Sequence, residues 1–399
     1  MHRLLFMIFS LLLFIVSDFI IFYKLKSASS RKFIPYAFLF LSLLAYLLIA
    51  LVFLIGRKNF THIWLPYYTL TYLIIKYVPQ LLITAFIIVD WLLGIVGLLA
   101  GSSGSFSFGR RGFLLQVGTF LSAITGFYLI YGIIRGRKAL RANVIKIHTE
   151  REGLKGFKIA FFSDLHGGTL SRTLMEDLVS EINNANVDVV LFGGDWINHF
   201  ADELEPFIPL LAKINARYGK FSCWGNHDYS MYYPWDSEED RLREMGRLKS
   251  LLRDSGFIVL ENEGVVINHN GVRVGIGGVE YWGKALRIKP ARLDKTFEAI
   301  SHADYKILLT HDPDHFTENM VHRLDKYPID LVLSGHTHGF QMGIMIDGFR
   351  FSPAQFMYRH WAGLYNVKGT YHYVSTGVGS IGYLGRAGVL PEVAIIEFV

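Results

Sequence analysis

The chain has 399 residues, of which 51% are hydrophobic and 19% are charged, and its formal net charge is +6. This length allows two domains, and the apolar content is too high for an ordinary soluble protein, so part of the chain is expected in a bilayer. The only cysteine is Cys223, which excludes an internal disulfide, gives no support for redox chemistry and suits a reducing compartment.

Four charge-poor apolar runs occupy the first third of the chain, and each reaches the ~20 residues that a helix needs to cross a bilayer. The runs are Leu4 to Tyr23, Phe33 to Ile55, Tyr67 to Ala100 and Phe113 to Ile134. The third run contains Lys76, Pro79 and Asp90, and predicts either one long tilted helix or a span from about Tyr77 preceded by an interfacial segment. We therefore predict an N-terminal bundle of about four transmembrane helices within residues 1–137, with the lipid bilayer as partner.

Basic residues flank these runs on both sides of the membrane, six on one side and seven on the other, so their number does not determine the orientation. The densest cluster follows the last run and contains Arg135, Arg137, Lys138 and Arg141. Because cytoplasmic loops are enriched in lysine and arginine, this cluster favours a cytoplasmic position for the domain that follows. These clusters supply much of the net charge, so anionic lipid headgroups are expected as counter-charge and no nucleic-acid partner is expected.

Residues 138–155 are expected to form a basic linker, and residues 156–399 one large domain. Five short apolar runs in that domain are typical of buried strands: Lys158 to Phe162, Val187 to Phe192, Lys220 to Trp224, Lys306 to Leu309 and Ile329 to Leu333. Amphipathic patterns at Arg172 to Ile182 and Asp240 to Leu252 predict helices on the sheet faces, hence an α/β domain. A second, partly antiparallel sheet is predicted by four alternating segments: Val265 to Ile267, Val272 to Ile276, Tyr371 to Ser375 and Val393 to Phe398.

Potential metal ligands follow each of the five apolar runs. Loops at the carboxyl ends of strands converge at one edge of an open α/β sheet, so these side chains are expected to surround one point. The candidate ligands are Asp164, His166, Asp195, Asn226, His311, His336 and His338. Carboxylate, amide and imidazole groups without cysteine favour two divalent ions of Mn, Fe or Zn over a structural zinc site. Glycines beside Asp195, Asn226 and His336 permit a close approach of the backbone to ions and phosphate.

The motifs D-x-H, G-G-D, G-N-H-D, a single histidine and G-H-T-H, in this order, resemble those of the calcineurin-like metallophosphoesterases over roughly Gly156 to Val399. The resemblance implies an α/β/β/α sandwich and hydrolysis of a phosphoric ester or diphosphate, in which a hydroxide held between two metal ions attacks phosphorus in line. It assigns Asp164, His166, Asp195 and His338 to one ion, and Asp195, Asn226, His311 and His336 to the other. Asp195 would therefore bridge the two ions.

The resemblance also implies that His227 acts as general acid or transition-state hydrogen-bond donor, oriented by Asp228. The subgroup that looks most similar consists of bacterial enzymes with N-terminal membrane segments, so the bacterial inner (cytoplasmic) membrane is the expected location. That subgroup often has glycine at the position of Phe340 and smaller apolar residues at the positions of Cys223 and Trp224. These departures affect the shape of the pocket and remove no ligand.

The membrane segments favour a phosphodiester or pyrophosphate in a membrane-associated substrate, such as a phospholipid, glycolipid precursor or lipid-linked sugar nucleotide. Two alternatives are a broad phosphodiesterase for soluble nucleotides that is merely tethered, and a non-catalytic metal-binding scaffold, against which the complete ligand set argues. The aromatic segment from Tyr229 to Trp235 either contacts an acyl chain or the membrane interface, or packs as an ordinary loop. The segment from Phe349 to Leu364 forms either a lipid-facing rim or phosphate clamp, or a structural hairpin. A further hypothesis is that Arg386 binds a second phosphate group.

Overall fold

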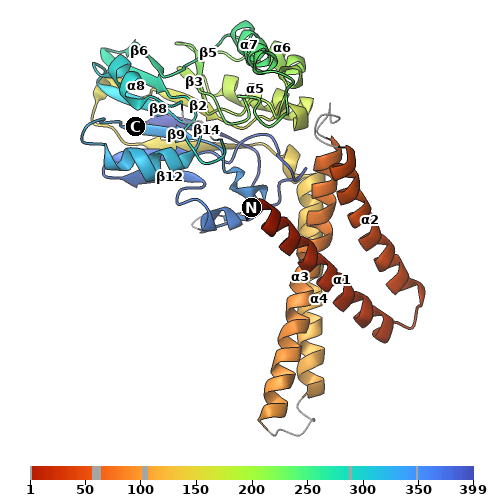
Figure 1. The fold of residues 1–399 in the computed structure, drawn as a ribbon. Coiled ribbons are helices and arrows are strands. Elements are labelled where there is room, and N and C mark those ends of the chain that lie inside the picture. The colour runs from red at the N-terminus through yellow and green to blue at the C-terminus, as the bar shows by residue number, and fades with distance from the viewer. Residues whose placement is uncertain (1, 56–63, 101–106, 287–289, 347–348) are drawn as a thin grey trace. The chain divides into compact units, whose positions relative to one another are not determined.

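The computed structural model describes residues 2–55, 64–100, 107–286, 290–346 and 349–399 (Figure 1). The chain divides into two compact units, Met1–Tyr131 and Gly132–Val399. The first unit is helical and the second contains the sheets, which confirms the predicted order of a transmembrane domain followed by an α/β domain.

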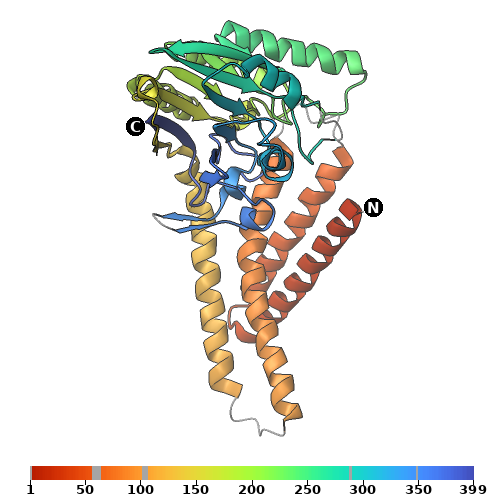
Figure 2. The same ribbon diagram turned by 90° about the vertical axis from the view of Figure 1, so that its left-hand side faces the viewer.

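Four long helices carry the apolar runs, and each contains a stretch that is long and apolar enough to cross a membrane. They are α1 (His2–Ala28), α2 (Phe33–Ile55), α3 (Trp64–Leu99) and α4 (Ser107–Ile134). Helix α3 is continuous over 36 residues with Pro79 inside it, so the alternative of a separate interfacial segment is wrong. Helices α3 and α4 lie side by side in both views (Figures 1 and 2), and such packing lets a membrane helix tolerate proline.

A buried polar network joins α1, α2 and α3 near the middle of their spans. The carboxylate of Asp18 accepts hydrogen bonds from Lys76 Nζ at 2.7 Å, Tyr46 Oη at 2.6 Å and Tyr77 Oη at 2.9 Å. Because an unpaired ionised group is costly in hydrocarbon, these donors compensate the charge and link the helices. The apolar surroundings of Asp18 in the sequence concealed this network.

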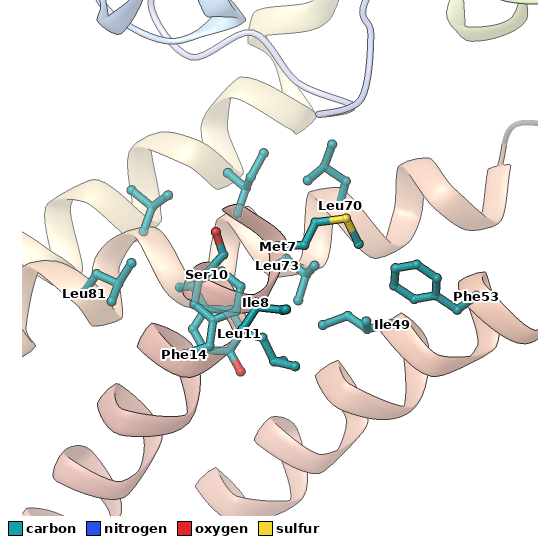
Figure 3. A pocket seen from close by; sticks show the side chains of 13 residues that line it. Met7, Ile8, Ser10, Leu11, Phe14, Ile49, Phe53, Leu70, Leu73 and Leu81 are labelled. Carbon is teal, nitrogen blue, oxygen red and sulfur yellow. The ribbon is translucent and has the colours of Figure 1, made fainter. Parts of the chain in front are cut away.

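The same three helices enclose an apolar pocket of about 660 Å³ (Figure 3). Its wall includes Met7 and Phe14 from α1, Ile49 and Phe53 from α2, and Leu73 from α3. The Phe14 ring stacks on Tyr77 with a centroid distance of 3.9 Å, so the pocket adjoins the polar network. A lining of this kind suits hydrocarbon and offers nothing to a charged ligand.

Two six-stranded sheets form the second unit. The first has the order β1 (Arg141–Ile147), β14 (Glu392–Phe398), β2 (Lys158–Phe162), β3 (Val189–Phe192), β4 (Lys220–Ser222) and β5 (Phe257–Val259). The second has the order β12 (Gly363–Val367), β13 (Thr370–Val374), β9 (Leu331–Ser334), β8 (Tyr305–Leu309), β7 (Val272–Gly278) and β6 (Glu263–His269). Three neighbouring pairs are antiparallel: β14 with β2, β6 with β7, and β12 with β13. The five predicted strands are therefore divided between two sheets, three in the first and two in the second.

Alternate residues of the central strands face two different cores, which explains their continuous apolar character. Phe161 and Ile307 belong to the core between the sheets. Phe162 lies in the core below the helices of the first sheet, and Leu308 in the core below the helix of the second. The covering helices are α5 (Arg172–Asn184), α6 (Ile208–Leu211) and α7 (Glu238–Asp254) on the first sheet, and α8 (Leu293–Ile300) on the second. The layers confirm the predicted α/β/β/α sandwich.

Strand β1 lies within the segment that was expected to be a linker. It pairs in parallel with β14 over seven residues, from Arg141 with Glu392 to Ile147 with Phe398. Ile145 and Ile147 contact the core between the sheets, and this alternation was hidden by the basic composition of the segment. The sheet thus begins before residue 156, and the expectation of a linker over all of residues 138–155 needs this correction.

Candidate metal centre

The seven predicted ligands lie in loops that follow the carboxyl ends of five strands. Asp164 and His166 follow β2, Asp195 follows β3, and Asn226 follows β4 in the first sheet, while His311 follows β8, and His336 and His338 follow β9 in the second. Six of these residues form two groups whose potential ligand atoms lie within 4.8 Å of one another: Asp164 with His166 and His338, and Asp195 with His311 and His336. The sandwich therefore brings together residues that are up to 174 positions apart.

The first group consists of buried side chains that face one another. Nε2 of His338 lies 3.3 Å from Oδ1 of Asp164 and 3.0 Å from Nε2 of His166. Asp164 is held by the backbone N–H of His336, which is 3.1 Å from both carboxylate oxygens, and by Ser163 Oγ at 2.5 Å. Two imidazole nitrogens and a carboxylate oxygen thus converge on one point, as a metal ion requires.

Asp195 belongs to the second group and also faces the first. Its Oδ2 lies 3.2 Å from Nε2 of His311 and 3.7 Å from Nε2 of His166. Nδ1 of His336 is 3.2 Å from Nε2 of His311, which completes the second group. Nδ1 of His311 is 2.7 Å from the carbonyl oxygen of Gly193, so it donates there and leaves Nε2 free to bind a metal ion.

The buried carboxylates of the two ligand groups favour a positive charge beside them. Burial alone would raise the pKa of Asp195, but the neighbouring imidazoles, His311 first among them, hold this pKa well below its usual range. Burial likewise opposes the charged form of His311, but the carboxylates of Asp195 and Asp164 raise its pKa to about 10. The two carboxylates therefore stabilise a cation beside them, which a divalent ion can supply in place of a proton.

The backbone is strained at these positions. Five of the seven predicted ligands have a left-handed φ between 46° and 73°, namely Asp164, His166, Asp195, His336 and His338. Such values cost free energy for residues other than glycine and cluster at functional sites. Two glycines permit the close approach of the loops, because a Cβ added at Gly225 would lie 2.1 Å from Asp195 Oδ1 and one at Gly335 would lie 2.3 Å from Asp164 Oδ2.

Asn226 is oriented as a ligand. Its Nδ2 donates to Tyr232 Oη at 2.9 Å, while its buried Oδ1 has no hydrogen-bond partner. A buried amide oxygen without a partner is costly unless an ion or water binds it. The loop is fixed to Asp195 because the backbone N–H of His227 donates to Oδ1 of Asp195 at 2.8 Å. The orphaned oxygen, the converging imidazoles and the two carboxylates therefore fit divalent metal ions.

The environment of His227 differs from the expectation in one respect. Its Nδ1 donates to the backbone carbonyl of Asn198 at 2.8 Å. The buried carboxylate of Asp228 instead accepts three backbone N–H groups, those of Asp195, Trp196 and Gly225, each at 2.8 Å. The prediction that Asp228 orients His227 is therefore wrong, because this carboxylate is occupied in joining the loops after β3 and β4.

Three residues near the ligands were not assigned from sequence. Oδ2 of Asp312 lies 3.6 Å from Nε2 of His336 and accepts a hydrogen bond from Tyr281 Oη at 3.1 Å, so it orients that imidazole. The Tyr232 ring lies 4.5 Å from the His227 ring, between ring centroids. Asp312 stands directly after His311 in the sequence, and this adjacency was the available signal.

Arg386 is fully buried and does not have the open position that a phosphate ligand needs. Its guanidinium donates to the carbonyl oxygens of Thr376 and Gly379, and Nη2 lies 3.2 Å from Nδ1 of His338. Because a guanidinium only donates, it faces the lone pair of Nδ1 of His338 in this arrangement. The hypothesis of a second phosphate site at Arg386 is thus replaced by a role in holding His338.

Comparisons with known proteins agree with this geometry. A profile described as calcineurin-like phosphoesterase matches residues 157–340, and one described as the transmembrane domain of a probable calcineurin-like phosphoesterase matches residues 2–137. The phosphodiesterase YaeI of Escherichia coli is 30% identical over 304 residues, which cover 73% of this chain and 99% of that protein. The chain belongs to the calcineurin-like phosphoesterase family.

Two other relatives are named as metallophosphoesterases, and one of these is named as a transmembrane protein. The uncharacterized metallophosphoesterase YkuE of Bacillus subtilis is 29% identical over 63% of this chain and 82% of its own length. A transmembrane protein with metallophosphoesterase domain from Danio rerio is 28% identical over 68% of this chain and 60% of its own length. The protein is thus a membrane-associated, metal-dependent phosphoester hydrolase with a site for divalent metal ions in the second unit.

Proposed function

We propose that the protein hydrolyses a phosphodiester or pyrophosphate bond in a lipid-linked or otherwise membrane-associated substrate, with two divalent ions of Mn, Fe or Zn. The observation that carries the two-ion proposal is the position of Asp195, because its Oδ2 faces both His311 and His166. One ion would be held by Asp164, His166, Asp195 and His338, and the other by Asp195, Asn226, His311 and His336. The donor set of oxygen and imidazole without thiolate supports this class of metals.

Bound divalent ions would supply Lewis-acid polarisation of the phosphoryl oxygens and a water molecule of lowered pKa. The chain itself would position the leaving group. With Nδ1–H of His227 bound to the carbonyl of Asn198, Nε2 of this half-buried ring would donate a proton or hydrogen bond to the leaving oxygen when the ring is in its imidazolium form. Asp228 would act as a positioning residue, because it fixes the loops that carry Asp195 and Asn226.

The membrane segments support the proposed substrate class. An enzyme held in the bilayer by four apolar helices meets membrane lipids at a high effective concentration. The basic cluster after the last helix supports a cytoplasmic position of the catalytic unit, and the bacterial relatives support the cytoplasmic membrane of a bacterium. For the domain boundaries we propose a transmembrane domain over residues 1–137 and a catalytic domain over residues 156–399, extended at its start by β1.

The catalytic proposal is tested with the full chain in detergent, Mn(II) and a soluble chromogenic phosphodiester. Asp195→Ala is expected to abolish turnover and to reduce the bound metal by at least one ion per chain, because it removes the shared ligand. Asp254→Ala is the matched control, since this carboxylate is exposed at the end of α7. Equal rates for the wild-type chain and Asp195→Ala would contradict the proposal.

The substrate class is tested by incubating a bacterial membrane lipid extract with the enzyme and Mn(II), followed by mass spectrometry of the products. We expect a phospholipid or glycolipid precursor to be cleaved at a phosphodiester or pyrophosphate bond. Cleavage of soluble nucleotides without any altered lipid would instead favour the tethered nucleotide phosphodiesterase. Fusions of a reporter to the C-terminus test the side of the membrane, and activity of a periplasm-specific reporter would contradict the cytoplasmic assignment.

A further inference from the structure

Exposed apolar side chains of the second unit are concentrated in one short segment. Among the described residues of Gly132–Val399, twelve large hydrophobic side chains are exposed, and seven of them lie between residues 340 and 357. The seven are Phe340, Ile344, Ile346, Phe349, Phe351, Phe356 and Met357. We call residues 340–346 and 349–357 the apolar hairpin. A concentration of this kind marks an interaction surface, because scattered exposed apolar residues are normal but a contiguous patch is costly in water.

The hairpin consists of β10 (Ile344–Ile346) and β11 (Phe349–Phe351), which pair antiparallel. The pairs Ile344 with Phe351 and Ile346 with Phe349 lie on one face, because alternate residues of a strand point to the same side. All four of these side chains are exposed, Ile346 at 64% and Phe349 at 52%. The described part of the second unit therefore leaves this face largely exposed.

The opposite face of the hairpin is attached to the protein. It carries the pair Met345 and Arg350. Met345 packs against the buried cluster that contains Trp361, while Arg350 donates to the carbonyl oxygen of Ala362 and lies over the Tyr365 ring. Because one face is fixed and the other is exposed, the apolar face is held outward rather than left to collapse onto the unit.

Two further exposed phenylalanines flank the two strands of the hairpin in the sequence. Phe356 is 78% exposed, and its ring centroid lies 6.4 Å from that of Phe351. Phe340 has a φ of +51°, which is strained for a bulky aromatic residue. The structure thus keeps an exposed phenylalanine in a costly backbone conformation, and such strain clusters at functional segments.

The base of the hairpin is joined to the loop that carries His336 and His338. Ser352 Oγ donates to the carbonyl oxygen of Gly339 at 2.6 Å, and the Tyr358 ring lies 5.8 Å from the ring of His336. A partner of the apolar face would therefore be located close to the metal ligands.

Basic groups accompany the apolar face. A cavity of about 340 Å³ beside the hairpin is lined by Arg141 and Arg350 together with Ile346 and Phe349, and by Glu392, which is paired with Asn143. Aromatic side chains with neighbouring arginines are typical of segments at the boundary between headgroups and acyl chains. Four membrane helices also keep this unit of the chain next to a bilayer.

We propose that the apolar hairpin inserts its exposed face into the interfacial region of the bilayer and so brings lipid headgroups to the metal centre. The occupant of the face is the bilayer, since Arg141 in the adjacent cavity suits anionic headgroups and the isoleucine and phenylalanine side chains suit acyl chains. Interfacial elements of this kind are buried by about 5–10 Å into the headgroup and acyl boundary. The bilayer contact does not depend on the proposed function. Only the kinetic experiment below rests on the proposed lipid substrate.

Insertion is measured on the full chain in nanodiscs that hold one copy, with a fluorophore attached to a single introduced cysteine. Cys223 is buried, so a thiol reagent labels the new position. Phe356→Cys and Ile346→Cys carry the label on the hairpin, and Leu242→Cys is the control, because Leu242 is also an exposed large hydrophobic residue and lies on α7. Phospholipids brominated near the top of the acyl chain are expected to quench both hairpin labels and to leave the control unchanged.

Two results would overturn the proposal. Hairpin labels that report water and are not quenched would show that the face does not enter the bilayer. Labels that become shielded only when several copies share one disc would assign the face to a second copy of the chain.

The kinetic consequence is measured as the ratio of the rates on a vesicle-bound phospholipid and on a soluble phosphodiester. Phe356→Ser is expected to lower this ratio about tenfold. Removing one large apolar side chain from the interface lowers the fraction of enzyme whose hairpin is inserted in the bilayer by about this factor. Leu242→Ser leaves the ratio unchanged. An unchanged ratio in Phe356→Ser contradicts the proposed use of the contact, whereas absence of any lipid hydrolysis contradicts the proposed substrate and leaves the quenching result valid.

Discussion

Replacing Gly225 with alanine moves the shared carboxylate without removing any ligand. A Cβ at this position would lie 2.1 Å from Oδ1 of Asp195 and 2.3 Å from its backbone nitrogen. Real contacts of a Cβ atom are not closer than 3.0 Å, so the carboxylate would have to retreat by at least 0.9 Å. The φ of Gly225 is not positive, so alanine suits the local backbone conformation and the cost comes from the contacts with Asp195.

A displacement of about 1 Å in a catalytic constellation costs roughly 10²-fold in rate, or about 2.7 kcal/mol in activation free energy. We expect Gly225→Ala to lose about this factor in kcat on a soluble phosphodiester with Mn(II), together with part of the bound metal, counted by elemental analysis. Gly246→Ala is the matched control, because a Cβ at this helical position would meet no atom within 4 Å. A Gly225→Ala enzyme with wild-type kcat and metal content would refute the proposed role of Asp195 between the two groups.

Three further perturbations have expected outcomes. Asp228→Ala should lower the melting temperature markedly, because three buried backbone N–H groups lose their acceptor at ~1–3 kcal/mol each, and an unchanged melt would refute the joining role. Chelation of metal should also lower the melting temperature, since ligand at about 100 times its Kd stabilises by ~2.7 kcal/mol, and equal melts with and without chelator would argue against a bound ion. In the membrane unit, Asp18→Ala should destabilise by ~3–5 kcal/mol because Lys76 loses its counter-ion, whereas adding Lys76→Met should restore part of the loss; additive effects in the melt would contradict this coupling.

The membrane helices and central strands were predictable because their signals are local. A run such as Phe33 to Ile55 is apolar throughout, and α2 has the same bounds. Lys158 to Phe162 coincides with β2 for the same reason, since both of its faces are buried. The two edge strands of the first sheet were missed. The basic residues of β1 hide its alternation of apolar and polar residues, and β5 has only three residues, too few to show such an alternation.

The candidate ligands were also predictable, because each follows a recognisable apolar strand. The contacts that orient them were not. His227 is held by the backbone carbonyl of Asn198, and a main-chain acceptor leaves no mark in the sequence. Arg386 illustrates the same limit, since only the packed structure shows that its guanidinium is buried beside His338 rather than open to phosphate.

By itself the sequence determined the two-part organisation, the α/β class of the second unit and the identity of the residues that could bind metal, because these depend on composition, period and residue type along the chain. Only the tertiary structure decided that two sheets share the site, that Oδ2 of Asp195 faces both groups, and that one face of β10 and β11 stays exposed. These features depend on distances between residues far apart in the chain, and on which of two strand faces finds a partner, and neither quantity is written in the local pattern.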